Sequence, residues 1–328
     1  MNIYITRPIP GIATDMLKKK GHTVTLQRER RNLSKSELIK KVKGKKYDAL
    51  LCLLTNTIDA SVIEACGPQL KIISNYAVGF DNIDLGVAAK KGIVVTNTPA
   101  LEVSTSVAEH TFALILSLSR RIVEADRYSR TGKYHGWDPD LLVGNDLHDR
   151  VLGLVGMGRI GKEVAKYAHS GFGMSVMYYD KHRDADFEKT YQARYVSFEK
   201  LLKTADIVSL HVPLLPTTRH LISAQTLRLM KKTALLVNTA RGPIVDEAAV
   251  LKALYAKKLG GFALDVFECE PDNDCNPNDQ MALKSLSNVI MTPHIASATI
   301  NARTAMARIA AQNIIDVFAG KRPEHVAK

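Results

Sequence analysis

The sequence lacks the features that mark metal-binding, disulfide-rich or membrane proteins. Only four of its 328 residues are cysteines (Cys52, Cys66, Cys269 and Cys275), and they form no C-x-x-C pair or other metal-ligand spacing. We therefore expect buried, reduced thiols and no metal site. No apolar run is long enough to cross a membrane, and the first residues read as a strand rather than a signal peptide. These absences favour a globular cytoplasmic protein with no membrane partner.

The chain also has no long block of one charge, although it is basic overall. The formal net charge is +12, but the lysines and arginines are spread along the sequence. Only short clusters stand out, at 18–20, 28–31 and 40–46. Without a basic tail or a recognition motif, this distribution indicates a lysine-rich solvated surface and no nucleic-acid partner. It remains compatible with small anionic substrates.

Length and local patterns predict two α/β domains. A chain of 328 residues corresponds to about two domains of usual size. Ser34 and Glu37 are spaced to form a capping box for a helix at 35–42. Up to residue 98, such helical patterns alternate with apolar runs that we predict to be strands: 3–6, 23–26, 49–54, 71–74 and 93–96. This alternation predicts a small, doubly wound parallel sheet.

A glycine-rich turn in the middle of the chain opens the second predicted domain. It contains Gly156, Gly158 and Gly161, follows an apolar strand at 151–155 and precedes a helix. The dinucleotide-binding pattern requires this strand–turn–helix context. The glycines let the backbone approach a pyrophosphate, and the N–H groups at the helix N-terminus favour its negative charge. Further strands at 207–210, 234–237, 261–265 and 289–291 complete a Rossmann-type sheet.

The second strand of this domain, 174–180, indicates which dinucleotide binds. It ends in Asp180, whose carboxylate can bond a ribose 2′-hydroxyl and would repel a 2′-phosphate, so we expect NAD. Three basic residues follow directly, Lys181, His182 and Arg183, and they keep NADP as the alternative.

Three chemically active residues follow three successive strands of the same domain. They are Arg241, Glu270 and His294, with Glu268 as an alternative carboxylate. Ligands of open α/β sheets bind at the carboxyl ends of strands, so these side chains should converge where a nicotinamide would lie. Arginine can hold a carboxylate. Histidine titrates near neutrality and can exchange a proton while a carboxylate orients its ring.

A single long helix is predicted at 103–127, between the two domains. Its middle, 112–118, is apolar nearly all round, so we expect it to be buried between domains or subunits. The loop after it contains Trp137, the only tryptophan of the chain. A monomer would expose the apolar helix surface, and we therefore expect a homodimer with an interface built from residues 103–150.

On its motifs, the chain resembles the D-isomer-specific 2-hydroxyacid dehydrogenase family over nearly its whole length. The motifs are the Gly156–Gly161 turn, Asn238-Thr-Ala-Arg-Gly-Pro, Asp265-Val-Phe-Glu with Glu270-Pro, and Pro293-His-Ile-Ala-Ser-Ala-Thr. Within the family, segment 73–84 and the loop at 134–144 look most like those of glyoxylate and hydroxypyruvate reductases.

The resemblance implies the catalytic residues and their surroundings. Arg241, Glu270 and His294 would be catalytic, with His294 as proton donor in the NAD(P)H-dependent reduction of a small 2-oxo acid. The substrate would also contact the backbone N–H groups of Val78 and Gly79, together with Trp137 of the partner subunit. The cofactor-binding residues would be Gly156, Gly158, Arg159, Ile160, Gly161, Asp180, Val212, Pro213, Thr218, Thr239 and Asp265.

We predict the domain boundaries accordingly. Residues 1–98 and 296–328 should form a flavodoxin-like substrate-binding domain, and 99–295 an NAD(P)-binding Rossmann domain that includes the dimerisation segment. Phosphoglycerate dehydrogenase, D-lactate dehydrogenase and a corepressor-like NAD-sensing scaffold are the alternative functions. The segment 271–280 looks longer than is usual for the family.

Overall fold

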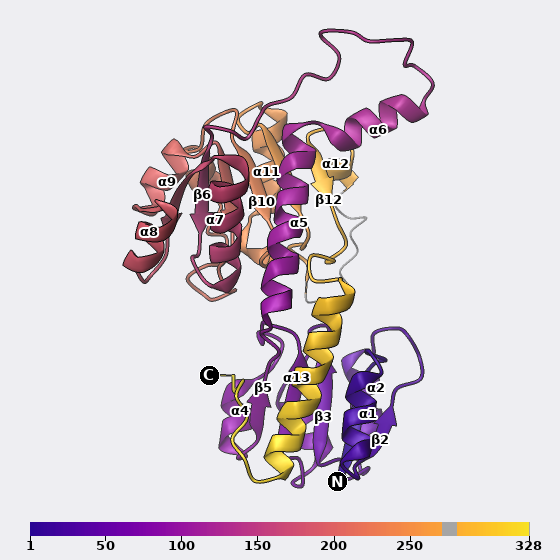
Figure 1. Cartoon of the computed structure of the whole chain (residues 1–328). Coiled ribbons are helices and arrows are strands. Elements are labelled where there is room, and N and C mark those ends of the chain that lie inside the picture. The colour runs from indigo at the N-terminus through magenta and orange to yellow at the C-terminus, as the bar shows by residue number, and fades with distance from the viewer. Residues whose placement is uncertain (271–280, 328) are drawn as a thin grey trace. The chain divides into compact units, whose positions relative to one another are not determined.

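Two parallel sheets, one in each of two structural units, organise the chain (Figure 1). The computed structural model describes residues 1–270 and 281–327. One unit contains residues 1–103 and 298–327, and the other contains residues 104–270 and 281–297. The predicted fold class, with two doubly wound parallel sheets, is confirmed.

The first unit is built on a five-stranded sheet in the order β2-β1-β3-β4-β5. The strands are β1 (Asn2–Ile5), β2 (Thr23–Leu26), β3 (Ala49–Leu53), β4 (Ile72–Tyr76) and β5 (Val94–Thr96). The helices are α1 (Ile12–Lys19), α2 (Lys35–Val42), α3 (Ala60–Cys66), α4 (Leu85–Lys90) and α13 (Ile300–Phe318). Because β1 pairs with β2 on one side and β3 on the other, the winding direction reverses at β1, as in flavodoxin-like sheets.

Local sequence signals set the start of α2. The Ser34 side chain accepts a hydrogen bond from the Glu37 N–H, and the Glu37 carboxylate accepts one from the Ser34 N–H. The predicted capping box is therefore confirmed, and the helix has the predicted bounds.

The C-terminal helix α13 returns to the first unit and packs on its sheet. The Ser74 hydroxyl on β4 donates to the Ala310 carbonyl at 3.1 Å. The sequence predicts a helix directly after Pro293, whereas α13 begins at Ile300, where the Thr299 side chain accepts from a first-turn N–H. The intervening residues contain a turn, and of these residues 294–297 belong to the second unit and 298–299 to the first.

The second unit is built on a seven-stranded sheet in the order β12-β11-β10-β9-β6-β7-β8. The strands are β6 (Val151–Val155), β7 (Ser175–Tyr179), β8 (Arg194–Tyr195), β9 (Ile207–Leu210), β10 (Leu235–Asn238), β11 (Gly261–Leu264) and β12 (Val289–Met291). The helices are α5 (Leu101–Ser119), which starts at the end of the first unit, α6 (Ile122–Arg130), α7 (Arg159–Phe172), α8 (Ala185–Tyr191), α9 (Phe198–Thr204), α10 (Ala224–Leu227), η1 (Gly242–Ile244), α11 (Glu247–Tyr255) and α12 (Met281–Lys284). The winding direction reverses between the neighbouring strands β6 and β9, which is where open α/β sheets bind ligands.

The predicted long helix between the domains is in fact two helices. α5 ends at Ser119 and α6 begins at Ile122, because Arg121 between them is left-handed, with φ of 53°. The Asn145 N–H closes the end of α5 by donating to the Ser119 carbonyl at 2.8 Å. Gly144 allows this approach, since a Cβ there would collide with the same carbonyl. A contact with a distant loop therefore ends the helix early.

The apolar side of α5 is buried inside its own unit. Ala108, Phe112, Leu114 and Ile115 belong to the same hydrophobic core as residues of β6, β7 and β10. The expectation that this helix needs a second subunit to cover it is therefore wrong. Exposed apolar side chains lie instead on α6 and the loop that follows it.

The described cysteines include two free thiols and one disulfide-bonded residue. Cys52 and Cys66 are buried free thiols, as expected, whereas Cys269 is disulfide-bonded, so the expectation of a reduced thiol is wrong there. Cys275 and the long segment 271–280 lie outside the described residues.

Within the described ranges, none of the helices combines the length and apolar character needed to span a bilayer.

Candidate active site

The glycine turn between β6 and α7 forms an open cradle at the carboxyl edge of the seven-stranded sheet. Gly156 has φ of 100°, and a Cβ on it would lie 2.6 Å from the His211 carbonyl oxygen. A Cβ on Gly161 would collide with the Gly156 carbonyl. A Cβ on Gly158, in contrast, would meet no atom within 4 Å. The protein's own packing requires the first two glycines, whereas the space beside Gly158 can take a ligand.

The N-terminus of α7 fits a dinucleotide pyrophosphate beside that space. The helix has 14 residues, and its N-cap residue, Gly158, offers no side chain to the first N–H groups. The N–H groups of Arg159, Ile160 and Gly161 lie in the first turn, where no acceptor exists within the helix. Unpaired donors and the positive end of the helix dipole favour an anion here.

Asp180 lies one residue past β7 and is held by two backbone N–H groups. Its Oδ2 accepts from the Met157 N–H at 2.6 Å, and its Oδ1 accepts from the His182 N–H at 3.2 Å. The first bond ties the carboxylate to the glycine turn, where a ribose would lie. Among the basic residues that follow, Arg183 donates to both carboxylate oxygens of Glu188, at 2.8 and 2.7 Å. Arg183 is therefore already paired.

The loop after β9 lies beside the glycine turn. A Cβ on Gly156 would approach Val212 Cγ1 to 3.0 Å. Thr218 closes the loop, because its hydroxyl donates to the Pro213 carbonyl at 2.7 Å and accepts from the Leu215 N–H at 2.8 Å. The predicted residues Val212, Pro213 and Thr218 thus share one loop next to the point where the winding direction reverses.

His294 and Glu270 form a close pair. His294 Nδ1 lies 2.7 Å from Glu270 Oε2, and each side chain is 26% exposed. His294 is left-handed, with φ of 54°, and its N–H donates to the Asp265 carbonyl at 2.8 Å. The alternative carboxylate, Glu268, lies instead 2.6 Å from His220 Nε2. The sequence favours Glu270 with Glu268 as the alternative, and in the structure Glu270 is the carboxylate that lies against His294.

The segment after β10 carries Arg241 and is held by buried polar side chains. Asn238 Nδ2 donates to the Arg241 carbonyl at 2.9 Å, and its Oδ1 accepts from the Ala240 N–H at 3.1 Å. Thr239 Oγ1 lies 3.1 Å from Thr111 Oγ1 on α5. These bonds fix the backbone from which the half-buried Arg241 side chain extends.

Gly242 brings this segment against the one that carries Glu270. A Cβ on Gly242 would lie 2.5 Å from the Glu268 backbone nitrogen and closer still to the Phe267 carbonyl. Only glycine permits this backbone contact. The predicted catalytic residues Arg241, Glu270 and His294 are thereby brought to neighbouring strand ends.

A buried polar network around Asp265 holds the turn that carries His294, and the sequence did not reveal this network. Asp265 is fully buried, and its carboxylate accepts from the Thr292 hydroxyl at 2.6 Å and from the N–H groups of Ile295 and Ala296 at 2.9 and 2.8 Å. His110 Nε2 on α5 lies 3.1 Å from Thr292 Oγ1. Because the Thr292 hydroxyl hydrogen points to Asp265, His110 Nε2 is the donor to Thr292.

This network keeps Asp265 ionised and fixes the turn that carries His294. Burial alone would raise the pKa of the Asp265 carboxyl, but hydrogen bonds from His110, Thr292 and two backbone N–H groups lower the pKa overall. The carboxylate binds the Thr292 hydroxyl before His294 and two backbone N–H groups after it. Asp265, predicted only as a cofactor contact, therefore also positions His294.

A separate loop follows β4 in the first unit. The N–H groups of Val78 and Gly79 donate to no acceptor among the described residues. Their carbonyls are held: Asn97 Nδ2 donates to Val78 at 2.6 Å, and Asn75 Nδ2 donates to Gly79 at 2.9 Å. The buried Asn82 side chain accepts a further bond from Asn75 at 2.9 Å. Two unpaired donors on a fixed backbone are suited to binding an anion.

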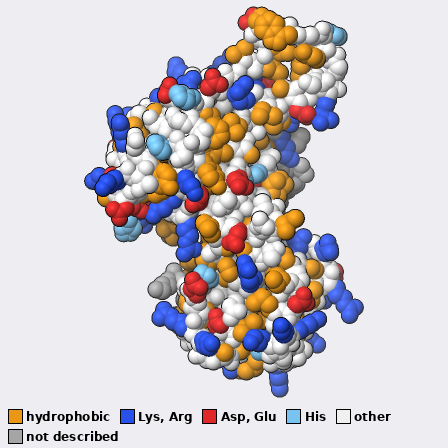
Figure 2. All heavy atoms as spheres, in the orientation of Figure 1, with side chains coloured by type: hydrophobic (Ala, Val, Ile, Leu, Met, Phe, Trp, Pro, Cys, Tyr) orange, Lys and Arg blue, Asp and Glu red, His pale blue; other side chains and the backbone are white. Residues whose placement is uncertain are grey.

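Trp137 does not pack on its own chain. Its side chain is 85% exposed, in the loop after α6 where Tyr134 and Val143 are also exposed. Figure 2 shows hydrophobic side chains gathered over this projecting segment of the second unit. The structure does not bring Trp137 together with the other predicted site residues of its own chain.

Known proteins resemble this chain over nearly its full length. Residues 112–296 match the family model for the NAD-binding domain of D-isomer-specific 2-hydroxyacid dehydrogenases. A glyoxylate reductase of Korarchaeum cryptofilum is 46% identical over 325 residues, which cover 99% of this chain and 95% of that protein. A crystal structure of a protein from Thermus thermophilus has a TM-score of 0.90 at 40% identity, covering 100% of both chains. D-lactate dehydrogenase from Aquifex aeolicus, solved with NAD and lactic acid, has a TM-score of 0.84 at 30% identity, covering 98% of this chain and 96% of that one.

These similarities agree with the geometry of the site. The family model covers more than half of the chain, and it matches the unit that contains the glycine turn and Asp180. The protein is an NAD-binding oxidoreductase that acts between 2-oxo and 2-hydroxy acids, and the resemblance seen in the sequence is confirmed. The chain belongs to the D-isomer-specific 2-hydroxyacid dehydrogenase family.

Proposed function

We propose that the protein uses NADH to reduce glyoxylate or hydroxypyruvate to the corresponding 2-hydroxy acid, of D configuration where the product is chiral. The contact that carries the proposal is the 2.7 Å pair between His294 Nδ1 and Glu270 Oε2 at the carboxyl edge of the cofactor-binding sheet. A histidine oriented by a carboxylate is suited to proton transfer. The identity to the glyoxylate reductase of Korarchaeum cryptofilum favours glyoxylate as the substrate.

His294 donates the proton in this reaction. Glu270 binds Nδ1, so Nε2 is the nitrogen that gives its proton to the substrate carbonyl oxygen. The carboxylate fixes the ring orientation and stabilises its protonated form. When bound, NADH supplies the hydride that reduces the carbonyl carbon.

Arg241 and the Val78–Gly79 loop hold the substrate. The Arg241 guanidinium is permanently charged and planar, so it can bind the substrate carboxylate and polarise the neighbouring keto oxygen. The unpaired N–H groups of Val78 and Gly79 suit a substrate carboxylate. In this proposal the unit of residues 1–103 and 298–327 contributes the Val78–Gly79 loop to substrate binding, and the unit of residues 104–270 and 281–297 binds the cofactor and carries Arg241.

Asp180 gives NADH the preference over NADPH. Its carboxylate is fixed beside the glycine turn by the 2.6 Å bond from Met157 and would repel a 2′-phosphate. Arg183, one of the residues that could receive that phosphate, is paired with Glu188. Lys181 and His182 are then the remaining basic residues in this segment, and both are exposed.

A homodimer completes the proposed enzyme. The proposal of a homodimer is supported by the loop after α6 rather than by α5. In this loop Trp137, Tyr134 and Val143 expose most of their apolar surface. We place Trp137 of the partner subunit at the substrate pocket. Trp137→Ala should then raise KM for bulkier 2-oxo acids without changing NADH affinity, and sedimentation of a stable, active monomer would refute the dimer.

The test of the activity is the rate of NADH and NADPH oxidation with a panel of 2-oxo acids, in wild-type protein and in His294→Ala. Glyoxylate or hydroxypyruvate with NADH should give the highest kcat/KM, and His294→Ala should lose on the order of 10²–10⁴ in rate. Near-normal kcat in a folded His294→Ala protein would contradict the mechanism. Tight NADH binding without turnover of any 2-oxo acid would favour an NAD-sensing scaffold instead.

A further inference from the structure

Two of the three basic clusters in the sequence fold around one cavity in the first unit. The cavity has a volume of about 450 Å³ and lies between β2, the segment that follows it, and α2. Its cationic lining residues are Arg28, Lys40, Lys41 and Lys45, which come from the clusters at 28–31 and 40–46. None of the residues in the proposed reaction lines it.

The four cations have no acidic partner among the residues that the structure describes. Each is exposed, and in the part of the chain that the structure describes none of them forms an ion pair with a carboxylate. Four positive charges around one cavity repel one another, and this repulsion would be relieved by an anion that bears several negative charges.

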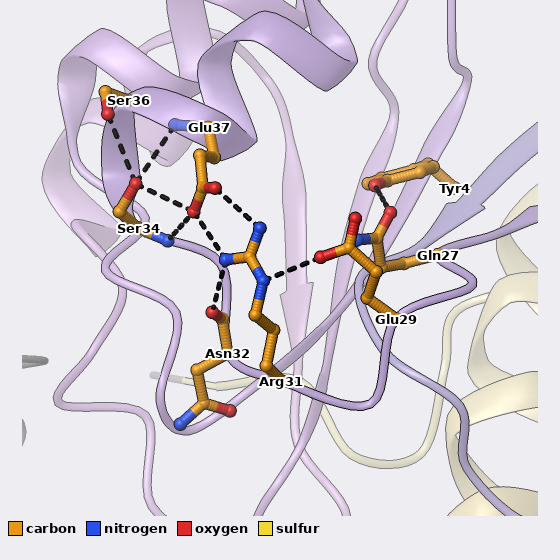
Figure 3. A network of polar contacts seen from close by, with 8 residues as sticks. All are labelled: Tyr4, Gln27, Glu29, Arg31, Asn32, Ser34, Ser36 and Glu37. Atoms are coloured by element: carbon orange, nitrogen blue, oxygen red, sulfur yellow. Dashed lines mark hydrogen bonds and ion pairs between the residues drawn. The ribbon is translucent and has the colours of Figure 1, made fainter.

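The one carboxylate that lines the cavity, among the residues described, is held by an arginine. Glu29 Oε2 lies 2.6 Å from Arg31 Nε (Figure 3). The same guanidinium donates to both oxygens of Glu37 at 2.9 and 2.7 Å, and this pairing, with bonds from Ser34, lowers the pKa of Glu37 to about 2. Arg31 therefore engages both nearby carboxylates, and these three side chains together carry one net negative charge against the four positive charges of the cavity.

Gln27 provides an independent sign of a ligand. It follows β2, lines the cavity and is only 4% exposed. The Tyr4 hydroxyl donates to Gln27 Oε1 at 3.3 Å (Figure 3), and burial raises the pKa of Tyr4 to about 12, so the hydroxyl keeps its proton. Gln27 Nε2 is buried and has no hydrogen-bond partner in the described structure. A buried donor without an acceptor costs free energy, which an acceptor oxygen of a ligand would recover.

We propose that this cavity is a second binding site, for a small anion with several negatively charged oxygens, such as a phosphoryl compound or a polycarboxylate. One oxygen accepts from Gln27 Nε2, and the lysines neutralise the others. The stacked rings of Tyr4 and Tyr47, 5.1 Å apart, form part of the cavity wall. The site is independent of the proposed reductase reaction.

Isothermal titration calorimetry with inorganic pyrophosphate and, separately, with citrate tests the proposal. The protein is saturated with NADH, so that the glycine turn is occupied, and ionic strength is held constant with sodium chloride. We expect saturable binding in the millimolar range or tighter. Comparison of the two affinities shows whether phosphoryl or carboxylate oxygens are preferred.

Two double variants with the same change in charge distinguish specific binding in the cavity from general electrostatic attraction to a basic protein. Lys40→Ala with Lys41→Ala should weaken binding roughly tenfold or more, because a charge-assisted hydrogen bond is worth at least that factor. Lys18→Ala with Lys19→Ala, in the last turn of α1 and outside the cavity, should leave the affinity nearly unchanged.

Gln27→Met keeps the side-chain length but removes the amide donor, and it should also weaken binding. Circular dichroism of each variant checks that it is folded. Three results would each overturn the proposal: no saturable binding of either anion, an equal loss in both double variants, or unchanged affinity in folded Gln27→Met.

Discussion

Replacing Gly242 by alanine should separate the two segments that carry the proposed catalytic residues. The added Cβ would lie 2.5 Å from the Glu268 nitrogen and closer to the Phe267 carbonyl, whereas ordinary contact begins at 3.4 Å. Both neighbours are backbone atoms, so no side chain can rotate away. The segments must therefore move apart by on the order of 1 Å, and a displacement of that size at an active site costs about 10²-fold in rate.

Steady-state kinetics with NADH and glyoxylate, together with thermal unfolding followed by circular dichroism, measure the effect. Gly242→Ala should lose about 10²-fold in kcat and unfold at a lower temperature, since overpacking of this kind costs about 1–3 kcal/mol. Gly171→Ala is the matched control, because a Cβ there meets nothing within 4 Å. A folded Gly242→Ala protein with the kcat of the control would refute the reasoning.

Three further substitutions test the cofactor, the proton donor and the buried network. Asp180→Ala should reduce the ratio of kcat/KM for NADH over NADPH, and an unchanged ratio would show that other residues set the preference. Glu270→Gln should lower kcat, because a neutral amide orients the His294 ring for proton donation less well than a carboxylate does; an unchanged kcat would argue against the pair. Asp265→Asn should cost about 2 kcal/mol in the free energy of unfolding at neutral pH. Folding lowers the pKa of Asp265, so the stability that its carboxylate contributes is present above the unfolded pKa of about 3.9 and is lost on acidification. Denaturant unfolding should therefore show a smaller difference in stability between wild type and Asp265→Asn at about pH 3. An equal difference at both pH values would contradict this assignment.

The strands and most helices could be predicted because their signals are local. The buried strand at 207–210 is a short apolar run and has the predicted bounds, and so do the edge strands at 23–26 and 289–291. Ser34 and Glu37 fix the start of α2 within one turn of the chain. The break between α5 and α6 could not be predicted in this way, since it depends on a loop that returns from residue 145.

The candidate site residues could be predicted from the sequence, but the hydrogen bonds that hold them in place could not. Arg241, Glu270 and His294 are recognisable because each follows a strand. The polar side chains that hold them contact partners far along the chain, as when His110 bonds Thr292 across 182 residues. The resemblance favours Glu270 over Glu268 because Glu270 directly precedes a proline, and the coordinates add the different partners of the two carboxylates, His294 and His220.

In each unit a buried polar side chain holds the backbone of the loop proposed to bind ligand. Asn75 holds the Val78–Gly79 loop through the Gly79 carbonyl, and Asp265 holds the turn of His294 through two backbone N–H groups. Each of these residues binds the backbone of the loop as well as neighbouring buried side chains, so it fixes the position of the loop without specifying its chemistry. The chemistry can then change by replacing exposed residues, whereas replacing a buried holder affects stability and rate together. Substrate choice in this chain should therefore depend on residues such as Trp137, and the geometry of catalysis on Asn75 and Asp265.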